Sequence, residues 1–348
     1  MLLKGEEEYY NRHIKLSDFG LVKQNVLKNS SVLVVGAGGL GCPVLQNLAG
    51  MGIGKIGIVD FDTIQVHNLH RQHLYTFADL GRKKVNVATQ KIKQLNPYIV
   101  VYKFDTELSV ENALDIISKF DYVVDCSDNF ATRYLVNDFC IYLNKPFVHG
   151  SISNYTGQIT VLNYKNGPSY RCLYPEAPNP EDSIDCNNNG VIALLPSIVG
   201  NLMAAQTCKV ILNEIDVLSG KLLIFDFIKF SFNTIKFSKI EQNFNLKPLD
   251  SYEFMCVNNT KISSAELKKH LENPEYDVID VRDEIEFSHY NIGGKNIPLN
   301  NFVNKIQEIS FKPNVILICN SGNRSIIAQK KINELHKINT SIIALNEL

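Results

Sequence analysis

The sequence has no excess of charge of either sign, because 35 lysine and arginine residues are balanced by 36 aspartate and glutamate residues. A balanced charge gives no bulk attraction to nucleic acid or to anionic membranes, so we expect neither as a partner. The chain also lacks an uninterrupted run of about eighteen apolar residues, the length that a membrane-spanning helix needs. Its first residues are charged and contain no signal-peptide core. We therefore expect a cytoplasmic protein.

A disulfide framework is missing as well. Eight cysteines are scattered over 348 residues, a pattern typical of an intracellular protein with reduced thiols. Hydrophobic residues make up 45% of the chain, which suffices for more than one hydrophobic core.

Residues 31–60 predict a strand, a glycine turn, a helix and a second strand. The first strand, Ser31–Val35, ends in a turn that contains four glycines, Gly36, Gly38, Gly39 and Gly41. The second strand, residues 56–59, ends on Asp60. Glycines let a backbone approach phosphates, a helix N-terminus favours their charge, and an acid in this place can bind ribose hydroxyls. The unit predicts a nucleotide site and leaves NAD, FAD and ATP open; a purely structural turn is the alternative.

The residues behind Asp60 favour ATP. Asn68, Arg71 and Lys84 lie close together in the sequence, and a triphosphate needs more cations and polar groups than a dinucleotide does. The alternative is that Lys83 and Lys84 only begin a solvated helix.

A further strand, residues 122–124, leads into Asp125-Cys126-Ser127-Asp128-Asn129 at the sheet edge where open α/β proteins bind their ligands. Asp128 is therefore well placed to hold magnesium. Acidic and amide side chains there can also cap the next helix, residues 130–143, and both roles can be divided among the loop residues.

The order of strands and helices predicts an α/β fold in which a parallel half is followed by a more antiparallel half. A region without apolar periodicity, residues 166–189, contains Cys172 and Cys186. We expect a first domain over residues 1–245, a linker over 246–259 and a small α/β domain over 260–348.

The second domain offers a cysteine at the end of a buried strand, residues 315–318. Cys319 is followed by a short loop to Arg324 and by a helix. Backbone N–H groups and a helix N-terminus stabilise a thiolate in such a place, and Arg324 adds positive charge or holds the loop. A thiolate of this kind can carry a sulfane sulfur as a persulfide.

Taken together, these segments resemble the MoeB/ThiF branch (HesA/MoeB/ThiF) of the ubiquitin-activating enzyme superfamily, joined to a C-terminal rhodanese domain. The resemblance implies a Rossmann-like ATP-binding adenylating domain with a mixed sheet, followed by a small rhodanese domain. The resemblance also implies roles for individual residues. The nucleotide loop would contain Gly36, Gly38, Gly39 and Gly41, and Asp60 would bind the ribose. The phosphates would be bound by Asn68, Arg71, Gln72 and Lys84, and magnesium by Asp128. Arg12 matches an arginine that reaches the ATP site of the partner subunit, which implies a homodimer.

The implied reaction is ATP-dependent adenylation of the C-terminal glycine of a ubiquitin-like sulfur carrier of the MoaD or ThiS type. Cys319, helped by Arg324, would then supply sulfur to form a thiocarboxylate, with a cysteine desulfurase as sulfur donor. Cys186 lies where this family keeps a cysteine able to link to the carrier, and an inert loop cysteine is the alternative. Molybdenum cofactor, thiamine and tRNA thiolation remain open as pathways.

Two other functions remain open. One is a modifier-activating enzyme for protein or peptide conjugation without sulfur transfer, and the other is a non-catalytic scaffold. One departure from the family is visible in the sequence. Many relatives hold structural zinc with two C-x-x-C pairs, but Ser169-Tyr170-Arg171-Cys172 keeps one cysteine and the second pair is missing. Four ligands are needed, so we expect no zinc site.

Overall fold

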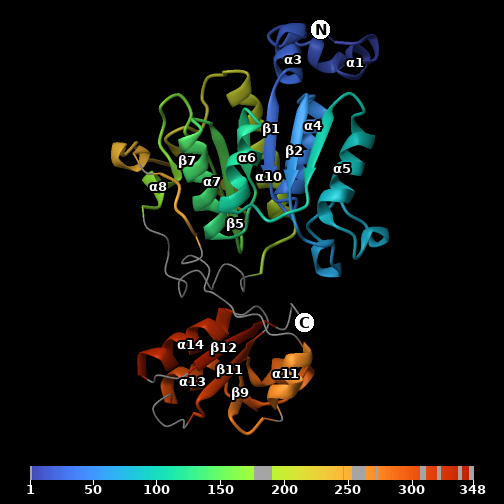
Figure 1. The fold of residues 1–348 in the computed structure, drawn as a ribbon. Coiled ribbons are helices and arrows are strands. Elements are labelled where there is room, and N and C mark those ends of the chain that lie inside the picture. Colours follow the sequence, from blue (N-terminus) through green and yellow to red (C-terminus); the bar gives the residue numbers. More distant parts are fainter. Residues whose placement is uncertain are drawn as a thin grey trace. The chain divides into compact units, whose positions relative to one another are not determined.

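The computed structural model describes residues 2–175, 190–245, 247–252, 264–271, 273–305, 311–319, 323–335 and 339–344. These residues form two compact units (Figure 1). The first unit extends to Tyr252, and the second contains the described residues beyond it.

The first unit is built on an eight-stranded mixed sheet with the order β3-β2-β1-β4-β5-β6-β7-β8. The first five strands are parallel to their neighbours and the last three are antiparallel. The strands are β1 (Ser31–Val35), β2 (Lys55–Val59), β3 (Val100–Phe104), β4 (Tyr122–Asp125), β5 (Phe147–Ser153), β6 (Thr156–Leu162), β7 (Lys221–Asp226) and β8 (Ser231–Lys236). The chain runs from β1 to one side through β2 and returns to the other side with β4. In open α/β sheets such a reversal places the ligand-binding crevice at the carboxyl ends of the two strands, here β1 and β4.

Helices cover both faces of this sheet. In Figure 1, α6 and α7 lie on one face, while α4 and α10 lie on the other, where α5 packs beside α4. The helices are α1 (Lys4–Tyr9), α2 (Asn11–Ile14), α3 (Gly20–Lys28), α4 (Gly41–Met51), α5 (Lys84–Leu95), α6 (Val110–Ser118), α7 (Phe130–Tyr142), α8 (Tyr170–Leu173) and α10 (Leu194–Ile211), with short 3-10 turns η1 (Val66–Asn68), η2 (Phe77–Asp79) and η3 (Glu241–Phe244). The predicted α/β class with a mixed sheet is confirmed.

Helix α10 is the one helix among the described segments that is long and apolar enough to cross a membrane. However, 56% of it is buried inside the unit, where it packs on β5, β6 and α4. Its apolar residues are therefore accounted for by the core of the domain.

Two local features are not evident from the sequence pattern. Strand β5 runs to Ser153, beyond the residues Phe147–His149 that pair with β4, because its second half pairs with the antiparallel strand β6. The segment 166–189, predicted to be irregular, contains the four-residue helix α8, whose Tyr170 and Cys172 are buried. A single helical turn has no periodicity that a sequence pattern could reveal.

The second unit has a four-stranded parallel sheet with the order β10-β9-β11-β12. Its elements are α11 (Ser264–Leu271), β9 (Tyr276–Asp280), α12 (Glu284–His289), β10 (Lys295–Asn296), α13 (Leu299–Lys305), β11 (Asn314–Cys319), α14 (Asn323–Leu335) and β12 (Asn339–Ala344). Its core contains Ile279, Phe302, Leu317 and Ala328.

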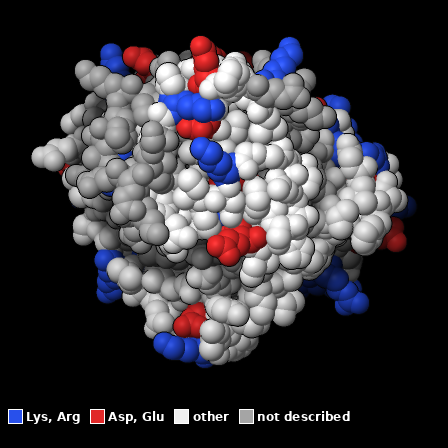
Figure 2. Space-filling view, turned by 90° about the horizontal axis from the view of Figure 1, so that it is seen from below, with Lys and Arg blue, Asp and Glu red and all other residues white. Residues whose placement is uncertain are grey.

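Charged side chains of both signs are interspersed on the face shown in Figure 2. The described residues on this face therefore offer no extended patch of one sign.

Candidate functional site

The glycine turn between β1 and α4 is closed too tightly for larger residues at two positions. Gly36 has a φ of +92°, and a Cβ there would lie 3.0 Å from the carbonyl oxygen of Cys126. A Cβ on Gly41 would lie 2.0 Å from the carbonyl oxygen of Gly36. The loop after β4 therefore rests directly on the turn, which leads into α4 at Gly41. The N-terminus of a helix favours a bound anion.

Asp60 closes this turn from the end of β2. Its Oδ2 accepts a hydrogen bond from Ala37 N at 2.7 Å, and its Oδ1 accepts one from Asp62 N at 2.9 Å. Burial raises the pKa of Asp60, and Lys84 opposes this effect. The acid predicted to bind ribose thus also orders the turn.

Lys84 lies at the start of α5 with only 7% of its side chain exposed. Its Nζ forms an ion pair with Asp62 Oδ2 at 2.7 Å. Sequence reasoning gave Asp62 no role, although its spacing of two residues from Asp60 is visible in the sequence. Tyr75 braces the same region, because its hydroxyl donates to the carbonyl oxygen of Ala37 at 2.8 Å.

The segment after η1 brings Arg71 and Gln72 to the glycine turn. The Cδ of Arg71 lies 4.0 Å from the position of a Cβ on Gly39, and Nε2 of Gln72 lies 3.6 Å from that of a Cβ on Gly38. Gln72 is buried, and its Oε1 has no hydrogen-bond partner within the described part of the chain. Asn68 is turned inward, because its Oδ1 accepts from Gln65 N at 3.0 Å.

Arg71 is held by its own segment. Its Nη1 donates to the carbonyl oxygen of His67 and to His70 Nε2, both at 2.8 Å. Burial lowers the pKa of Arg71, and the nearby carboxylate of Asp128 opposes this effect. Arg71 and Asp128 are therefore electrostatic neighbours on the two sides of the crevice.

In the loop after β4, helix capping and the predicted magnesium binding belong to different residues. Asn129 caps α7, since its Oδ1 accepts from Thr132 N at 2.8 Å. Asp128 is exposed, and no hydrogen bond or ion pair joins it to another described residue. Its carboxylate is thus available to a cation.

Beneath this loop lies a buried polar network that sequence reasoning missed. Asp125 and His149 are joined by a hydrogen bond of 2.8 Å, and Asp125 also accepts from Ser127 Oγ at 2.6 Å. Arg133 of α7 is buried beside them and donates weakly to the carbonyl oxygen of Ser127 at 3.5 Å. The sequence shows Asp125 as an acid at the end of a strand, but it does not show that its partner His149 lies on the neighbouring strand.

Among the described residues of the first unit, Arg12 is predicted for the site but is not brought to the crevice of its own chain. Arg12 is exposed on α2, whose neighbour Tyr10 packs against Gly52 at the far end of α4. The length of α4 therefore separates Arg12 from the glycine turn of its own chain. Cys186 lies outside the described residues.

Cys172 lies in a shell of hydrogen-bond donors. Its Sγ accepts from Ser169 N at 3.4 Å, Ile240 N at 3.2 Å and Asn243 Nδ2 at 3.6 Å, and Ser169 Oγ lies 3.2 Å away. Burial, the largest single influence, raises the pKa of this thiol, but the hydrogen bonds together lower it. Within the described ranges no group of three or more histidine, cysteine or acidic side chains could hold a metal ion.

In the second unit, Cys319 ends β11 and is fully buried. Arg324 follows in the first turn of α14 and forms an ion pair with Glu286 of α12. The other arginine of this unit, Arg282, is buried and paired with Asp280 at 2.7 Å. Residues 320–322, between Cys319 and α14, lie outside the described residues.

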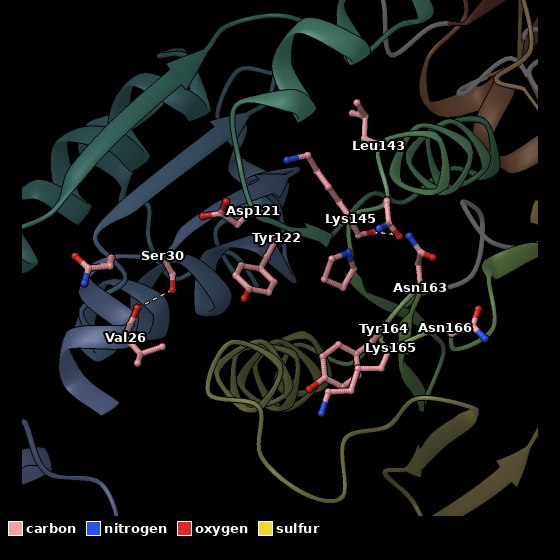
Figure 3. Close-up of a pocket in the computed structure, with 13 residues that line it drawn as sticks. Val26, Ser30, Asp121, Tyr122, Leu143, Lys145, Asn163, Tyr164, Lys165 and Asn166 are labelled. Carbon is pink, nitrogen blue, oxygen red and sulfur yellow. Dashed lines mark hydrogen bonds between the residues drawn. The ribbon is translucent and has the colours of Figure 1, made fainter. Parts of the chain in front are cut away.

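A cavity of about 820 Å³ lies at the amino-terminal ends of β1, β4 and β5, the edge opposite the glycine turn (Figure 3). Its polar groups have internal partners: Ser30 Oγ donates to the Val26 carbonyl at 2.7 Å, and Asn163 Nδ2 donates to the Lys145 carbonyl at 3.0 Å. We therefore place the nucleotide site at the crevice.

Comparison with protein families gives two matches. The ThiF family matches residues 10–246, and the rhodanese-like domain matches residues 263–346.

Several relatives align over most of their length. "Adenylyltransferase and sulfurtransferase MOCS3" of Culex quinquefasciatus is 38% identical over 94% of this chain and 82% of its own. "Probable molybdopterin-synthase adenylyltransferase" of Pyropia yezoensis is 41% identical over 93% of this chain and 89% of its own.

Solved structures agree on the fold. Escherichia coli MccB with ATP aligns with a TM-score of 0.59 and 24% identity over 67% of this chain and 71% of its own. PaaA aligns with a TM-score of 0.58 and 22% identity over 69% of this chain and 76% of its own.

Proposed function

The chain belongs to the ThiF family and continues into a rhodanese-like domain, and on this basis we propose that it is an adenylyltransferase and sulfurtransferase for a ubiquitin-like sulfur carrier. The names of its relatives support both activities. The observation that carries the proposal is that one chain holds two chemical centres: a glycine turn flanked by Arg71 and Lys84, and a buried strand-end cysteine, Cys319.

The crevice fits MgATP. Gln72 Oε1 is buried without a partner among the described residues, and a Cβ on Gly38 would meet nothing nearer than 3.6 Å. A phosphate chain and its ligands would occupy this space. Asp128 would hold magnesium, which commonly takes one or two carboxylates together with phosphate oxygens. When bound, the metal neutralises charge on the phosphates.

Adenylation requires positioning and cations more than covalent help from the protein. The C-terminal carboxylate of the carrier attacks the α-phosphorus of ATP, a P–O bond to the β-phosphate breaks, and pyrophosphate leaves with the electron pair. Arg71 and Lys84 stabilise the charge on the phosphates, and Asp60 orients the ribose. Lys84 must exchange its contact with Asp62 for one with phosphate.

Sulfur transfer follows at Cys319. The Cys319 thiolate takes the outer sulfur of a persulfide donor, such as a cysteine desulfurase, whose own thiolate leaves. The Cys319 persulfide then attacks the acyl carbon of the adenylate, AMP leaves, and an acyl disulfide remains. Attack by a second thiolate, for which Cys186 is the candidate, releases the thiocarboxylate and leaves a disulfide that a cellular dithiol reduces.

The proposal also includes a homodimer and a cytoplasmic location. The distance of Arg12 from the glycine turn of its own chain supports a homodimer in which Arg12 serves the partner's site. The reduced thiols that the sulfur steps require are consistent with a cytoplasmic location.

The test is ATP–pyrophosphate exchange with a panel of carriers ending in Gly-Gly, each compared with a version lacking the last glycine. Exchange with one intact carrier but not with its truncation is expected, and that carrier names the pathway. A product without sulfur, despite exchange, would favour protein conjugation. ATP binding without exchange for any carrier would favour a scaffold.

A further inference from the structure

Arg324, an electrostatic neighbour of Cys319, is held by a carboxylate. Arg324 Nη1 lies 2.5 Å from Glu286 Oε2, and Arg324 Nη2 lies 2.8 Å from Glu286 Oε1. This bidentate arrangement matches the fork of a guanidinium to the two oxygens of a carboxylate, which is the strongest geometry for such a pair.

Glu286 is also held by hydrogen bonds within its own helix turn, independently of Arg324. It occupies the third position of α12, where its backbone N donates to Asp283 Oδ1 at 2.9 Å and its Oε2 accepts from Asp283 N at 3.2 Å. The hydrogen bond from Arg324 is the main cause that lowers the pKa of Glu286 to about 2. The carboxylate is therefore ionised at any physiological pH.

The surroundings of Arg324 are acidic. Its pKa is raised first by the hydrogen bond with Glu286, and its other electrostatic neighbours are Cys319 and Asp283. One guanidinium is thus matched by two carboxylates, while Arg282 is already paired with Asp280. An incoming anion therefore meets an arginine whose charge is already compensated by Glu286, although Arg324 follows Cys319 closely in sequence.

We propose that Glu286 is a specificity-determining residue that directs Cys319 away from small dianionic sulfur donors, such as thiosulfate, and toward donors of lower charge, such as a cysteine persulfide. This inference rests on the proposed sulfurtransferase function of Cys319. Binding of a dianion requires uncompensated positive charge, and Glu286 supplies the compensating negative charge.

Sulfur transfer from thiosulfate to cyanide provides the assay. The Cys319 thiolate attacks the sulfane sulfur of thiosulfate, the S–S bond breaks, and sulfite leaves with the electron pair. Cyanide then takes the sulfur as thiocyanate and restores the thiolate. Methanethiosulfonate presents the same kind of sulfane sulfur with one negative charge less and releases a sulfinate.

In the unaltered full-length protein, we expect KM for thiosulfate to exceed KM for methanethiosulfonate by about tenfold, as expected for one extra repelled charge at short range. In Glu286→Gln this ratio should approach one, chiefly through a lower KM for thiosulfate. Transfer from cysteine persulfide should change by less than about threefold, since that donor, like methanethiosulfonate, carries one negative charge less than thiosulfate.

Two variants separate charge from geometry. Glu284→Gln removes a charge from the same helix at an exposed position without a contact to Arg324, and it should keep the original ratio. Glu286→Asp keeps the charge and should keep most of the ratio. Equal KM values for both donors in the unaltered protein, or a change in Glu286→Asp as large as that in Glu286→Gln, would overturn the proposal.

Different results would contradict the sulfurtransferase function itself. Cys319→Ala must abolish transfer from every donor, and an unaltered protein that transfers sulfur from no donor would contradict the sulfurtransferase assignment itself. If Glu286→Gln lost activity with cysteine persulfide as well, the ratio measured in the unaltered protein would still decide the question.

Discussion

His149 donates a hydrogen bond from Nδ1 to Oδ2 of Asp125, the residue directly opposite it in the parallel pairing of β4 and β5, at 2.8 Å. Both side chains are buried. Because the bond occupies Oδ2, the other oxygen of Asp125 is free to accept from Ser127 N and Oγ at 3.1 and 2.6 Å. This pair therefore fixes the loop from which Asp128 extends.

Replacing Asp125 with asparagine should weaken both stability and adenylation. An amide cannot accept the bonds of Ser127 and His149 together, and a buried donor then loses its partner. We expect a loss of about 2–4 kcal/mol in the free energy of unfolding and at least a tenfold fall in ATP–pyrophosphate exchange. Ser127→Ala removes one hydroxyl bond and should cost less by chemical denaturation; an equal cost would contradict the central role of Asp125.

The same pair predicts a dependence of stability on pH. Burial lowers the pKa of His149 from its ordinary value of 6.5, and Asp125 opposes this effect. Below pH 6.5 the unfolded chain therefore binds a proton at His149 that the folded chain does not. This contribution is complete above that pH and is lost as the pH falls toward the folded pKa. His149→Gln, whose amide can still donate to Asp125, should flatten this part of the curve in urea titrations; an unchanged slope would exclude His149 as its source.

This network also shows what the sequence could predict. The run Ser31–Val35, the glycine turn and Asp60 were readable because strand, turn and helix follow one another in the chain, and their bounds agree closely with the structure. The long-range partners of Asp125, Arg324 and Cys172 could not be predicted from the sequence. Each of these partners lies on a distant element that only the folded arrangement of strands and helices brings near, so local sequence patterns do not reveal it.

Gly36 and Gly38 should respond differently to alanine. Gly36→Ala forces a side chain into a left-handed conformation and against the Cys126 carbonyl, so a loss of about 1–3 kcal/mol is expected in denaturation. A Cβ on Gly38 meets only Gln72 Nε2 at 3.6 Å, so stability should be kept, while KM for ATP rises because the methyl group occupies the proposed phosphate path. Normal ATP kinetics in Gly38→Ala would argue against that path.

Arg12 should act across a dimer interface. Arg12→Ala and Asp128→Ala are each expected to be inactive in ATP–pyrophosphate exchange. After mixing and subunit exchange, half of the dimers combine one chain of each kind and hold one intact site, so about a quarter of the unaltered activity should return. Mixing without any recovery, although mixed dimers are detected by native mass spectrometry, would place Arg12 outside the partner's site.

The shell around Cys172 supports the expectation that this domain has no structural zinc. Ser169 and Cys172 stand three residues apart, as do Ile240 and Asn243, and both pairs meet at one sulfur. Hydrogen bonds thus join α8 to the segment near η3.

We therefore expect less than about one tenth of an equivalent of zinc in the purified protein and no change in Tm on adding a chelator. Cys172→Ala should lower the free energy of unfolding by about 1–3 kcal/mol, because three donors lose their acceptor. Conversely, cysteines at Ser169, Ile240 and Asn243 recreate two C-x-x-C pairs and should bind zinc with a Tm that a chelator lowers. Stoichiometric zinc in the unaltered protein would contradict this account, since Cys172 would then have ligand partners beyond its hydrogen-bond shell.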